Sequence, residues 1–226
     1  MDYNQLKERV PEPTFSLVQE SINRSFKNRT LLSALYQGYN PEQNRAYKPV
    51  FDKVIPYGPV NAKRAIFNTF PAPRDISSGV PFSDYHGYIF LGYLSHLKID
   101  REDVYMSSVV KSDDYLNLPN DQFSDHLYEW VASYLFQELS QIDATHILFM
   151  GERTCRVVKE MLNQSSTLTM EQIRSSSDTT NILGRQATFY YTYDSIRLMI
   201  EDDSNYSNYA AAIWNDLNTF IDASNN

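Results

Sequence analysis

Three side chains capable of acid–base chemistry lie close together in the sequence. Asp75, Asp84 and His86 fall within one short stretch that follows a predicted strand. A carboxylate can activate a water molecule as a general base, and an imidazole can hold or transfer a proton. Asp75 or Asp84 is therefore a candidate for water activation, with His86 nearby. The alternative is structural, with both acids as solvated loop carboxylates and His86 as part of a helix cap.

No metal site and no cofactor are expected. The four histidines stand at unrelated spacings, and Cys155 is the single cysteine, so neither a metal cluster nor a disulfide framework is indicated. The phosphate-binding patterns Gly-x-Gly-x-x-Gly and Gly-x-x-x-x-Gly-Lys do not occur in the sequence. Ser108 lacks the surrounding glycines of a nucleophile elbow, so no motif supports a role for it as a nucleophile.

Short apolar runs alternate with amphipathic stretches along the middle of the chain. Strands are predicted at 64–69, 103–110, 146–150 and 187–192. Strands that alternate with helices are typical of a parallel sheet covered on both faces. We therefore predict an α/β fold, a three-layer α/β/α sandwich with a central four-stranded parallel sheet. Ligands bind such sheets at the carboxyl ends of the strands, where four loops should gather: 69–82, 111–120, 151–153 and 193–197.

The chain is predicted to form a single domain over residues 1–226. Residues 1–62 would supply an N-terminal helix and an aromatic loop, residues 63–200 the core, and residues 201–226 a C-terminal helix. The aromatic loop either pins itself to the core or offers a stacking surface for bases. The Ser/Thr-rich stretch 164–182 is expected to be a loop. Helices are predicted over 14–36, 86–98 and 121–142, directly after Gly151, and over 206–221.

Charge is distributed unevenly along the sequence. The net charge of −8 argues against broad, nonspecific nucleic-acid binding, which depends on Lys and Arg neutralising phosphates. Residues 1–74 carry 11 Lys/Arg against 6 Asp/Glu, whereas residues 75–226 carry 9 against 22. The N-terminal third therefore presents either a local basic face or a solvated surface of mixed charge. No apolar run suits a transmembrane helix or a signal segment, and we expect a cytoplasmic monomer.

Five short motifs follow one another in order: Asn68-Thr-Phe-Pro-Ala72, Gly79-Val-Pro-Phe82, Met106-Ser-Ser-Val-Val-Lys111, Leu148-Phe-Met-Gly151 and Thr192-Tyr-Asp-Ser195. In order and spacing they resemble the uracil-DNA glycosylase superfamily, most nearly its iron–sulfur-containing family 4 branch. The resemblance covers roughly residues 60–200. It implies the superfamily's α/β/α fold, a role in DNA repair, and hydrolysis of the N-glycosidic bond after a base has been flipped into a pocket.

The resemblance also implies which positions carry the chemistry, and three of them are replaced. Thr69 stands where the family has a carboxylate that positions water or stabilises the cationic sugar. Ser108 stands in place of the asparagine that reads the uracil edge, and Asp194 in place of the histidine that stabilises the departing base. Pro71 and Phe82 are retained, and Phe82 would either stack on the base or pack in the core. The family's iron–sulfur cysteines are missing.

The sequence leaves three interpretations open. The first is a uracil-DNA glycosylase-like protein with weak or lost uracil excision, acting as a nucleic-acid-binding or interaction module. The second is an active, divergent DNA glycosylase that hydrolyses the N-glycosidic bond of a damaged or deaminated base. In both, the partner is single- or double-stranded DNA that contains uracil or a damaged base. The third is an unrelated α/β domain that binds a nucleotide or small metabolite. The candidate catalytic positions are Thr69, Asp75 and Asp194, and the candidate base-binding positions are Pro71, Phe82 and Ser108.

Overall fold

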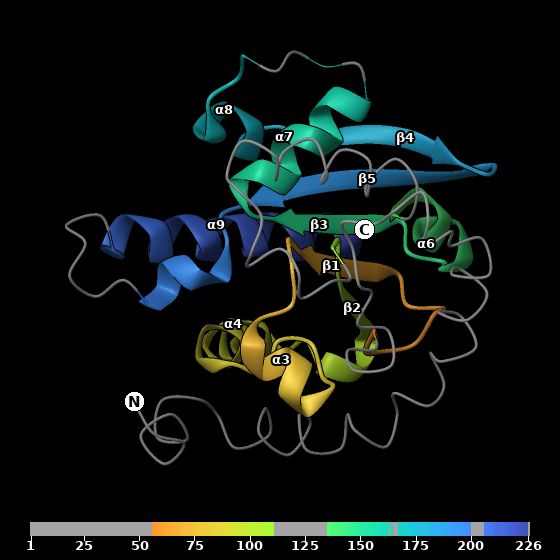
Figure 1. The fold of residues 1–226 in the computed structure, drawn as a ribbon. Coiled ribbons are helices and arrows are strands. Elements are labelled where there is room, and N and C mark those ends of the chain that lie inside the picture. Colours follow the sequence, from red (N-terminus) through yellow and green to blue (C-terminus); the bar gives the residue numbers. More distant parts are fainter. Residues whose placement is uncertain (1–55, 111–134, 163, 165–166, 200–205, 226) are drawn as a thin grey trace, which may run out of the picture.

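A computed structural model describes residues 56–110, 135–162, 164, 167–199 and 206–225 of the chain. Their strands are β1 (Arg64–Asn68), β2 (Val104–Ser108), β3 (His146–Met150), β4 (Asp178–Ile182) and β5 (Arg185–Thr192). They form one sheet in the order β2–β1–β3–β5–β4 (Figure 1). The first four strands of that order are mutually parallel, and β4 pairs antiparallel with β5 at the edge.

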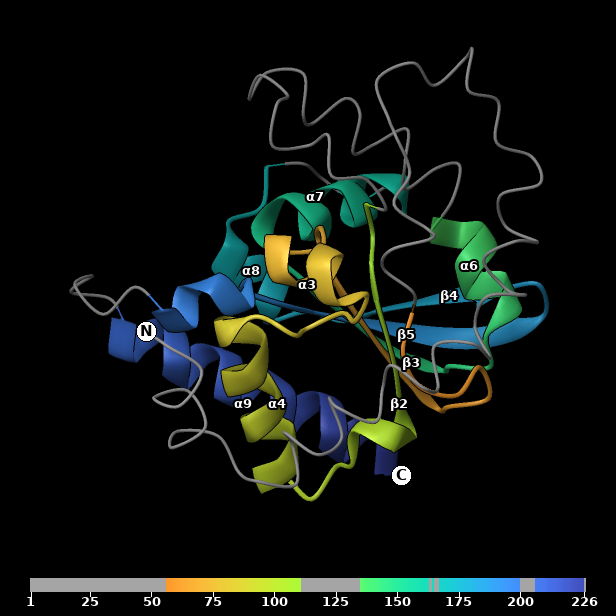
Figure 2. The same ribbon diagram turned by 60° about the horizontal axis from the view of Figure 1, so that its bottom comes forward.

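Helices cover both faces of the sheet and complete a three-layer α/β/α sandwich. α4 (Tyr85–His96) and α9 (Tyr206–Asn225) pack on one face. α6 (Phe136–Gln141), α7 (Glu152–Met161) and α8 (Met170–Arg174) pack on the other. Figure 2 shows the sheet between α6 and α7 above and α4 and α9 below. A short helix, α3 (Pro73–Ser78), lies in the connection from β1 to α4.

Two apolar clusters fill the spaces between these layers because side chains alternate across each strand. Phe67 and Phe149 point toward the face of α7, with their ring centroids 5.8 Å apart. Ile66 and Leu148 point toward the face of α4 and α9. Burial on both faces explains why the central strands appear in the sequence as continuous apolar runs rather than as alternating patterns.

The predicted α/β sandwich is confirmed, with one strand more than predicted. The four predicted strands correspond, in chain order, to β1, β2, β3 and β5. The stretch 164–182, predicted as a loop, instead contains α8 and β4. The β4 segment, Asp178-Thr-Thr-Asn-Ile182, has no apolar run, and it is a strand because it pairs with β5 through long-range hydrogen bonds. Its position at the edge of the sheet tolerates such a polar sequence.

Several predicted segments lie outside the described residues: the helix at 14–36, the aromatic loop up to residue 55, the loop at 111–120 and most of the helix at 121–142. The helix predicted directly after Gly151 is α7, and the C-terminal helix is α9, which continues to Asn225. No helix in the described part of the chain combines the length and apolar content that a membrane span requires.

A buried ion pair attaches the edge strand β4 to α7. The Nζ of Lys159, a residue only 1% exposed, lies 2.6 Å from Asp178 Oδ2. The same ammonium group donates to Gln164 Oε1 at 3.1 Å and to Ser176 Oγ at 2.8 Å. The hydroxyl of Tyr191 donates to Asp178 Oδ2 at 2.5 Å. The charges are thus fully surrounded by partners, which a buried pair requires in order not to destabilise the fold.

Removing one member of this buried ion pair should therefore lower the free energy of unfolding far more than breaking an exposed ion pair. We expect Lys159→Met to lower the free energy of unfolding by about 3–5 kcal/mol, because it leaves the Asp178 carboxylate buried and uncompensated. The matched control is Glu152→Gln, which breaks the exposed Glu152–Arg156 pair of the same helix and should cost about 1 kcal/mol or less. Urea denaturation measures both, and equal effects would contradict the structural role of the buried pair.

Candidate functional site

The carboxyl ends of β1, β3 and β5 come together at Gly151, the residue between β3 and α7. Gly151 has φ +96°, a conformation that favours glycine. A Cβ atom there would lie 2.4 Å from Thr69 Oγ1 and 3.3 Å from Asp194 Oδ2. The Gly151 amide also donates to the Thr192 carbonyl at 3.0 Å. The absence of a side chain thus lets two of the candidate catalytic residues approach one point from different strands.

Thr69 is buried, and its hydroxyl is fully engaged within the protein. Its Oγ1 donates to the Met150 carbonyl at 3.1 Å and accepts from Thr154 Oγ1 at 3.0 Å. Since Thr154 belongs to α7, these bonds turn the Thr69 side chain toward that helix. A neutral hydroxyl that already donates its proton to a carbonyl in a hydrogen bond is poorly placed to activate water.

Asp194 is partly buried in the turn that follows β5. Its Oδ1 accepts from the Ile196 amide at 3.1 Å, at the start of the 3₁₀ helix Ser195–Met199. Burial raises the pKa of Asp194, while the bond from Ile196 and the charge of His86 act in the opposite direction without cancelling it. The carboxyl group therefore takes up a proton more readily than an exposed aspartate does.

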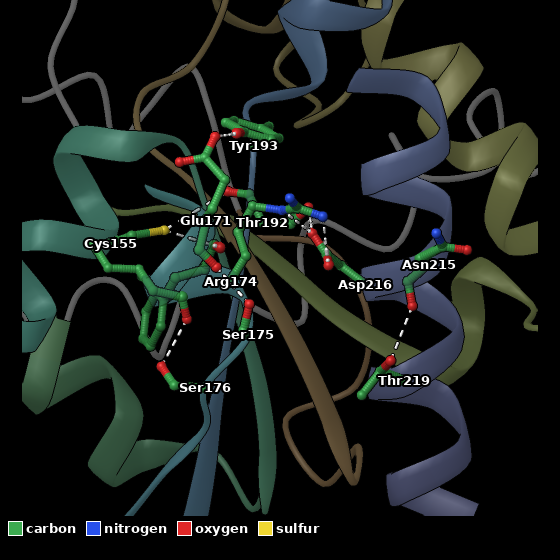
Figure 3. Close-up of polar contacts among 12 residues, drawn as sticks. Cys155, Glu171, Arg174, Ser175, Ser176, Thr192, Tyr193, Asn215, Asp216 and Thr219 are labelled. Atoms are coloured by element: carbon green, nitrogen blue, oxygen red, sulfur yellow. Dashed lines mark hydrogen bonds and ion pairs between the residues drawn. The ribbon is translucent and has the colours of Figure 1, made fainter. Parts of the chain in front are cut away.

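A clamp between two helices holds the end of β5 (Figure 3). Arg174 of α8 donates to both carboxylate oxygens of Asp216 on α9, at 2.6 Å and 2.9 Å, and the Thr192 hydroxyl donates to the same carboxylate at 2.7 Å. The guanidinium lies 4.7 Å from the ring centroid of Tyr193, whose hydroxyl donates to Glu171 at 2.6 Å. These contacts fix the backbone immediately before Asp194, the candidate catalytic residue.

Asp75 is buried, and both of its oxygens are used to fold the loop between β1 and α4. Oδ2 accepts from the Ala72 amide at 3.0 Å, and Oδ1 accepts from the Ser83 amide at 2.7 Å and the Ser83 hydroxyl at 3.0 Å. Burial, followed by the charge of Asp84, raises the pKa of Asp75 to about 6. Asp75 is thus not a solvated loop carboxylate, and its hydrogen bonds give it a positioning role in this structure.

Asp84 and His86 form a pair at the first turn of α4. Asp84 is 8% exposed and caps the helix, with Oδ1 accepting from the Gly87 amide at 2.9 Å. Its other oxygen pairs with His86 Nε2. Burial lowers the pKa of His86, but the hydrogen bond and charge of Asp84, together with the charges of Asp194 and Asp75, outweigh burial and raise it. The charges of three acidic residues thus favour the protonated form of this imidazole.

The remaining candidate positions lie in the core or on the α4 side of the sheet. Phe82 is 1% exposed and stacks on Phe90 with ring centroids 5.4 Å apart, so its ring packs in the core. Pro71 is buried in the loop between β1 and α3. Ser108 is buried at the end of β2, opposite Asn68 in the sheet register.

The structure does not bring all candidate positions onto one surface. The side chain of Ser107 reaches Glu138 of α6 at 2.8 Å, so alternation along β2 directs Ser108 to the opposite face, that of α4. Thr69 instead contacts α7 on the other face. Thr69 and Asp194 approach each other at Gly151, whereas Ser108 faces the α4 side with Asn68. In the described residues, no three His, Cys, Asp or Glu side chains are arranged to hold a metal ion.

Sequence reasoning missed two features of the site. The close approach at Gly151 has a detectable signal, because a glycine at a strand–helix junction in a glycine-poor chain indicates a special backbone position. The clamp of Arg174 and Asp216 has no detectable signal in the sequence, because its two residues come from helices far apart in the chain.

Comparison with known families identifies the fold. A family model described as the uracil DNA glycosylase superfamily matches residues 55–218 of the chain. This range contains all five strands and every candidate site residue. The chain belongs to the uracil-DNA glycosylase superfamily, which excludes the interpretation as an unrelated α/β domain. We found no match to the chain among curated proteins.

The close packing at Gly151 can be tested with a matched pair of glycine variants. Gly151→Ala should destabilise the protein by about 1–3 kcal/mol more than Gly184→Ala, because overpacking adds to backbone strain only at residue 151. Gly184 has a similar φ of +89°, but a Cβ there meets nothing within 4 Å. Thermal or urea unfolding measures the difference. Equal losses of stability in the two variants would show that the strand ends do not depend on this contact.

The pairing of His86 with Asp84 can be tested through the pKa of the imidazole. Two-dimensional NMR titration should find its pKa above the ordinary value of about 6.5, and Asp84→Asn should lower it. A raised pKa means that the imidazolium contributes stability at low pH, which is lost as pH rises through that pKa. Asp100→Asn, an exposed acid beyond the far end of α4, is the control and should leave the titration unchanged. A pKa of His86 that is insensitive to Asp84→Asn would contradict the pairing.

Proposed function

We propose that this chain is a nucleic-acid-binding member of its superfamily in which uracil excision is weak or lost. The carboxyl end of the sheet is the surface that would receive DNA containing uracil or a damaged base. The single observation that carries the proposal is that the Thr69 hydroxyl is already engaged in hydrogen bonds within the protein. This hydroxyl is buried and shared between the Met150 carbonyl and Thr154, at the position where the family resemblance implies a working carboxylate.

The charges around the site support the same proposal. Hydrolysis of a glycosidic bond needs positive charge or hydrogen-bond donors at the departing base, which leaves as an anion. Asp194 occupies the position for which the resemblance implies a histidine, and a carboxylate repels an anion. The imidazole of His86 is paired with Asp84, and the charges of Asp75 and Asp194 also act on it. The local charge balance is therefore negative, which disfavours release of an anionic base.

An excision assay tests this function directly. Loss of one catalytic group commonly costs ~10²–10³ in rate, so replacement of three groups should leave little activity. We expect the wild-type chain to bind uracil-containing single- or double-stranded oligonucleotides but to produce almost no alkali-labile sites in them. An active superfamily member, assayed in parallel, provides the control. Excision at a rate close to that of the active enzyme would overturn the loss of activity, and failure to bind any oligonucleotide would overturn the nucleic-acid-binding function.

The pair formed by His86 and Asp84 favours a second candidate, excision of a different base. The imidazole pairs with Asp84, and the charge of Asp194 also favours its protonated form, so it can hold a proton. The same alkali assay, run over oligonucleotides with deaminated and alkylated bases, tests this candidate. Activity on one of them that is abolished by Asp84→Asn or Asp194→Asn would assign the chemistry to this group. Activity that survives both changes would show that other residues carry it.

A further inference from the structure

The end of β1 holds a buried amide whose oxygen is unsatisfied. Asn68 is 8% exposed, and its Oδ1 accepts no hydrogen bond from any residue in the described ranges. The main-chain carbonyl of Asn68, by contrast, accepts from the Val109 amide at 2.8 Å. Buried polar side-chain atoms nearly always have a partner, so an amide left without one at the carboxyl end of a central strand calls for an explanation.

The sheet register places this amide next to one of the candidate base-binding residues. Asn68 and Ser108 are directly paired across the parallel strands β1 and β2. Alternation puts both side chains on the face of Ile66 and Met106, which is the face covered by α4 and α9. Phe82 belongs to the same apolar cluster. An amide and a hydroxyl therefore lie on neighbouring strands and on the same face of the sheet.

The first turn of α4 packs on the loop that carries Phe82. Gly87, in that turn, packs so closely on the Phe82 backbone that a Cβ atom would approach the Phe82 carbonyl carbon to 2.6 Å. The loop before the helix is held from within by Arg101, whose Nη2 donates to the Pro81 carbonyl at 2.5 Å. The backbone around Phe82 is thus closely packed and held in place.

An amide that has both a donor and an acceptor matches the edge of a nucleobase. A side-chain amide can accept from a ring N–H and donate to the neighbouring carbonyl in one plane. The Asn68 Oδ1 atom has no hydrogen-bond partner among the described residues, so it can accept from a ligand without losing a bond to them. Ser108 is too short to make both bonds, but its hydroxyl lies on the adjacent strand.

We propose that Asn68 is the residue of this chain that reads the edge of a bound nucleobase, selecting bases that present an N–H group beside a carbonyl. The amide stands on β1, one strand away from the β2 position that Ser108 occupies. This inference rests on the proposed nucleic-acid-binding function. It adds a specificity-determining residue that the motif positions alone do not include.

Two probes that differ by one methyl group test the proposal. Each is a labelled single-stranded oligonucleotide with one central nucleotide, either 2′-fluoro-2′-deoxyuridine or its N3-methyl derivative. The fluorine resists glycosidic hydrolysis, and the methyl group removes the ring N–H. By fluorescence anisotropy, the wild-type chain should bind the unmethylated probe at least about fivefold more tightly, the lower bound for a bidentate contact with a base. Asn68→Leu should bind both probes alike.

Stability measurements separate this role from a structural one. Leucine has a similar shape to asparagine and no polar atoms, so Asn68→Leu should leave the urea midpoint unchanged or raise it. The matched control is Ser107→Ala on the opposite face of β2, which removes a hydroxyl bound to Glu138. This variant should lose stability but keep the preference for the unmethylated probe.

The possible outcomes separate the inference from the function on which it rests. Wild-type binding to both probes with equal affinity would retain nucleic-acid binding and overturn the role of Asn68. A preference that survives in Asn68→Leu would overturn it as well, as would a large loss of stability in that variant together with loss of all binding. If the wild-type chain binds neither probe, the nucleic-acid-binding function and the inference both fail.

Discussion

The geometry of the site depends on a residue that has no side chain. Gly151 allows the Thr69 hydroxyl and the Asp194 carboxylate to occupy space that a Cβ atom would fill. The space is limited because β1, β3 and β5 are parallel and end at the same level. The segments that follow these strands therefore lie close together. The Gly151 amide, which donates to the Thr192 carbonyl, adds a hydrogen bond beyond the end of the β3–β5 ladder.

The two faces of the sheet differ in how well their polar groups are satisfied. On the α7 face, Lys159 and Asp178 are buried with several partners each, and the Thr69 hydroxyl accepts from Thr154 and donates to the Met150 carbonyl. On the α4 face, the Asn68 amide oxygen has no partner among the described residues. Satisfied buried networks contribute to a unique fold, whereas an unsatisfied group costs stability. The polar groups named on the α7 face are thus paired, whereas the α4 face contains a buried acceptor without a described partner.

Sequence patterns predicted the parts of the fold that depend on local apolar runs. β3 matches its predicted bounds because His146–Met150 is a short apolar run followed by glycine. β4 was not predictable in this way, because its polar residues form a strand only by pairing with β5. At the site, the meeting of Thr69 and Asp194 follows from the parallel topology. The importance of Asn68 does not, because it depends on the register with Ser108 and on which hydrogen bonds are missing.

Electrostatics connect the two proposals for this chain. Recognition of a neutral base edge requires an oriented amide and hydroxyl, and neighbouring carboxylates interfere with it little because the ligand edge carries no net charge. Expulsion of the base is different, because negative charge develops on the leaving group and the carboxylates around His86 oppose it. Under the proposed function, the charges of Asp75, Asp84 and Asp194 would therefore permit the chain to hold a base and disfavour its release as an anion. Binding and cleavage, which one pocket serves in an active glycosylase, need not have been lost together here.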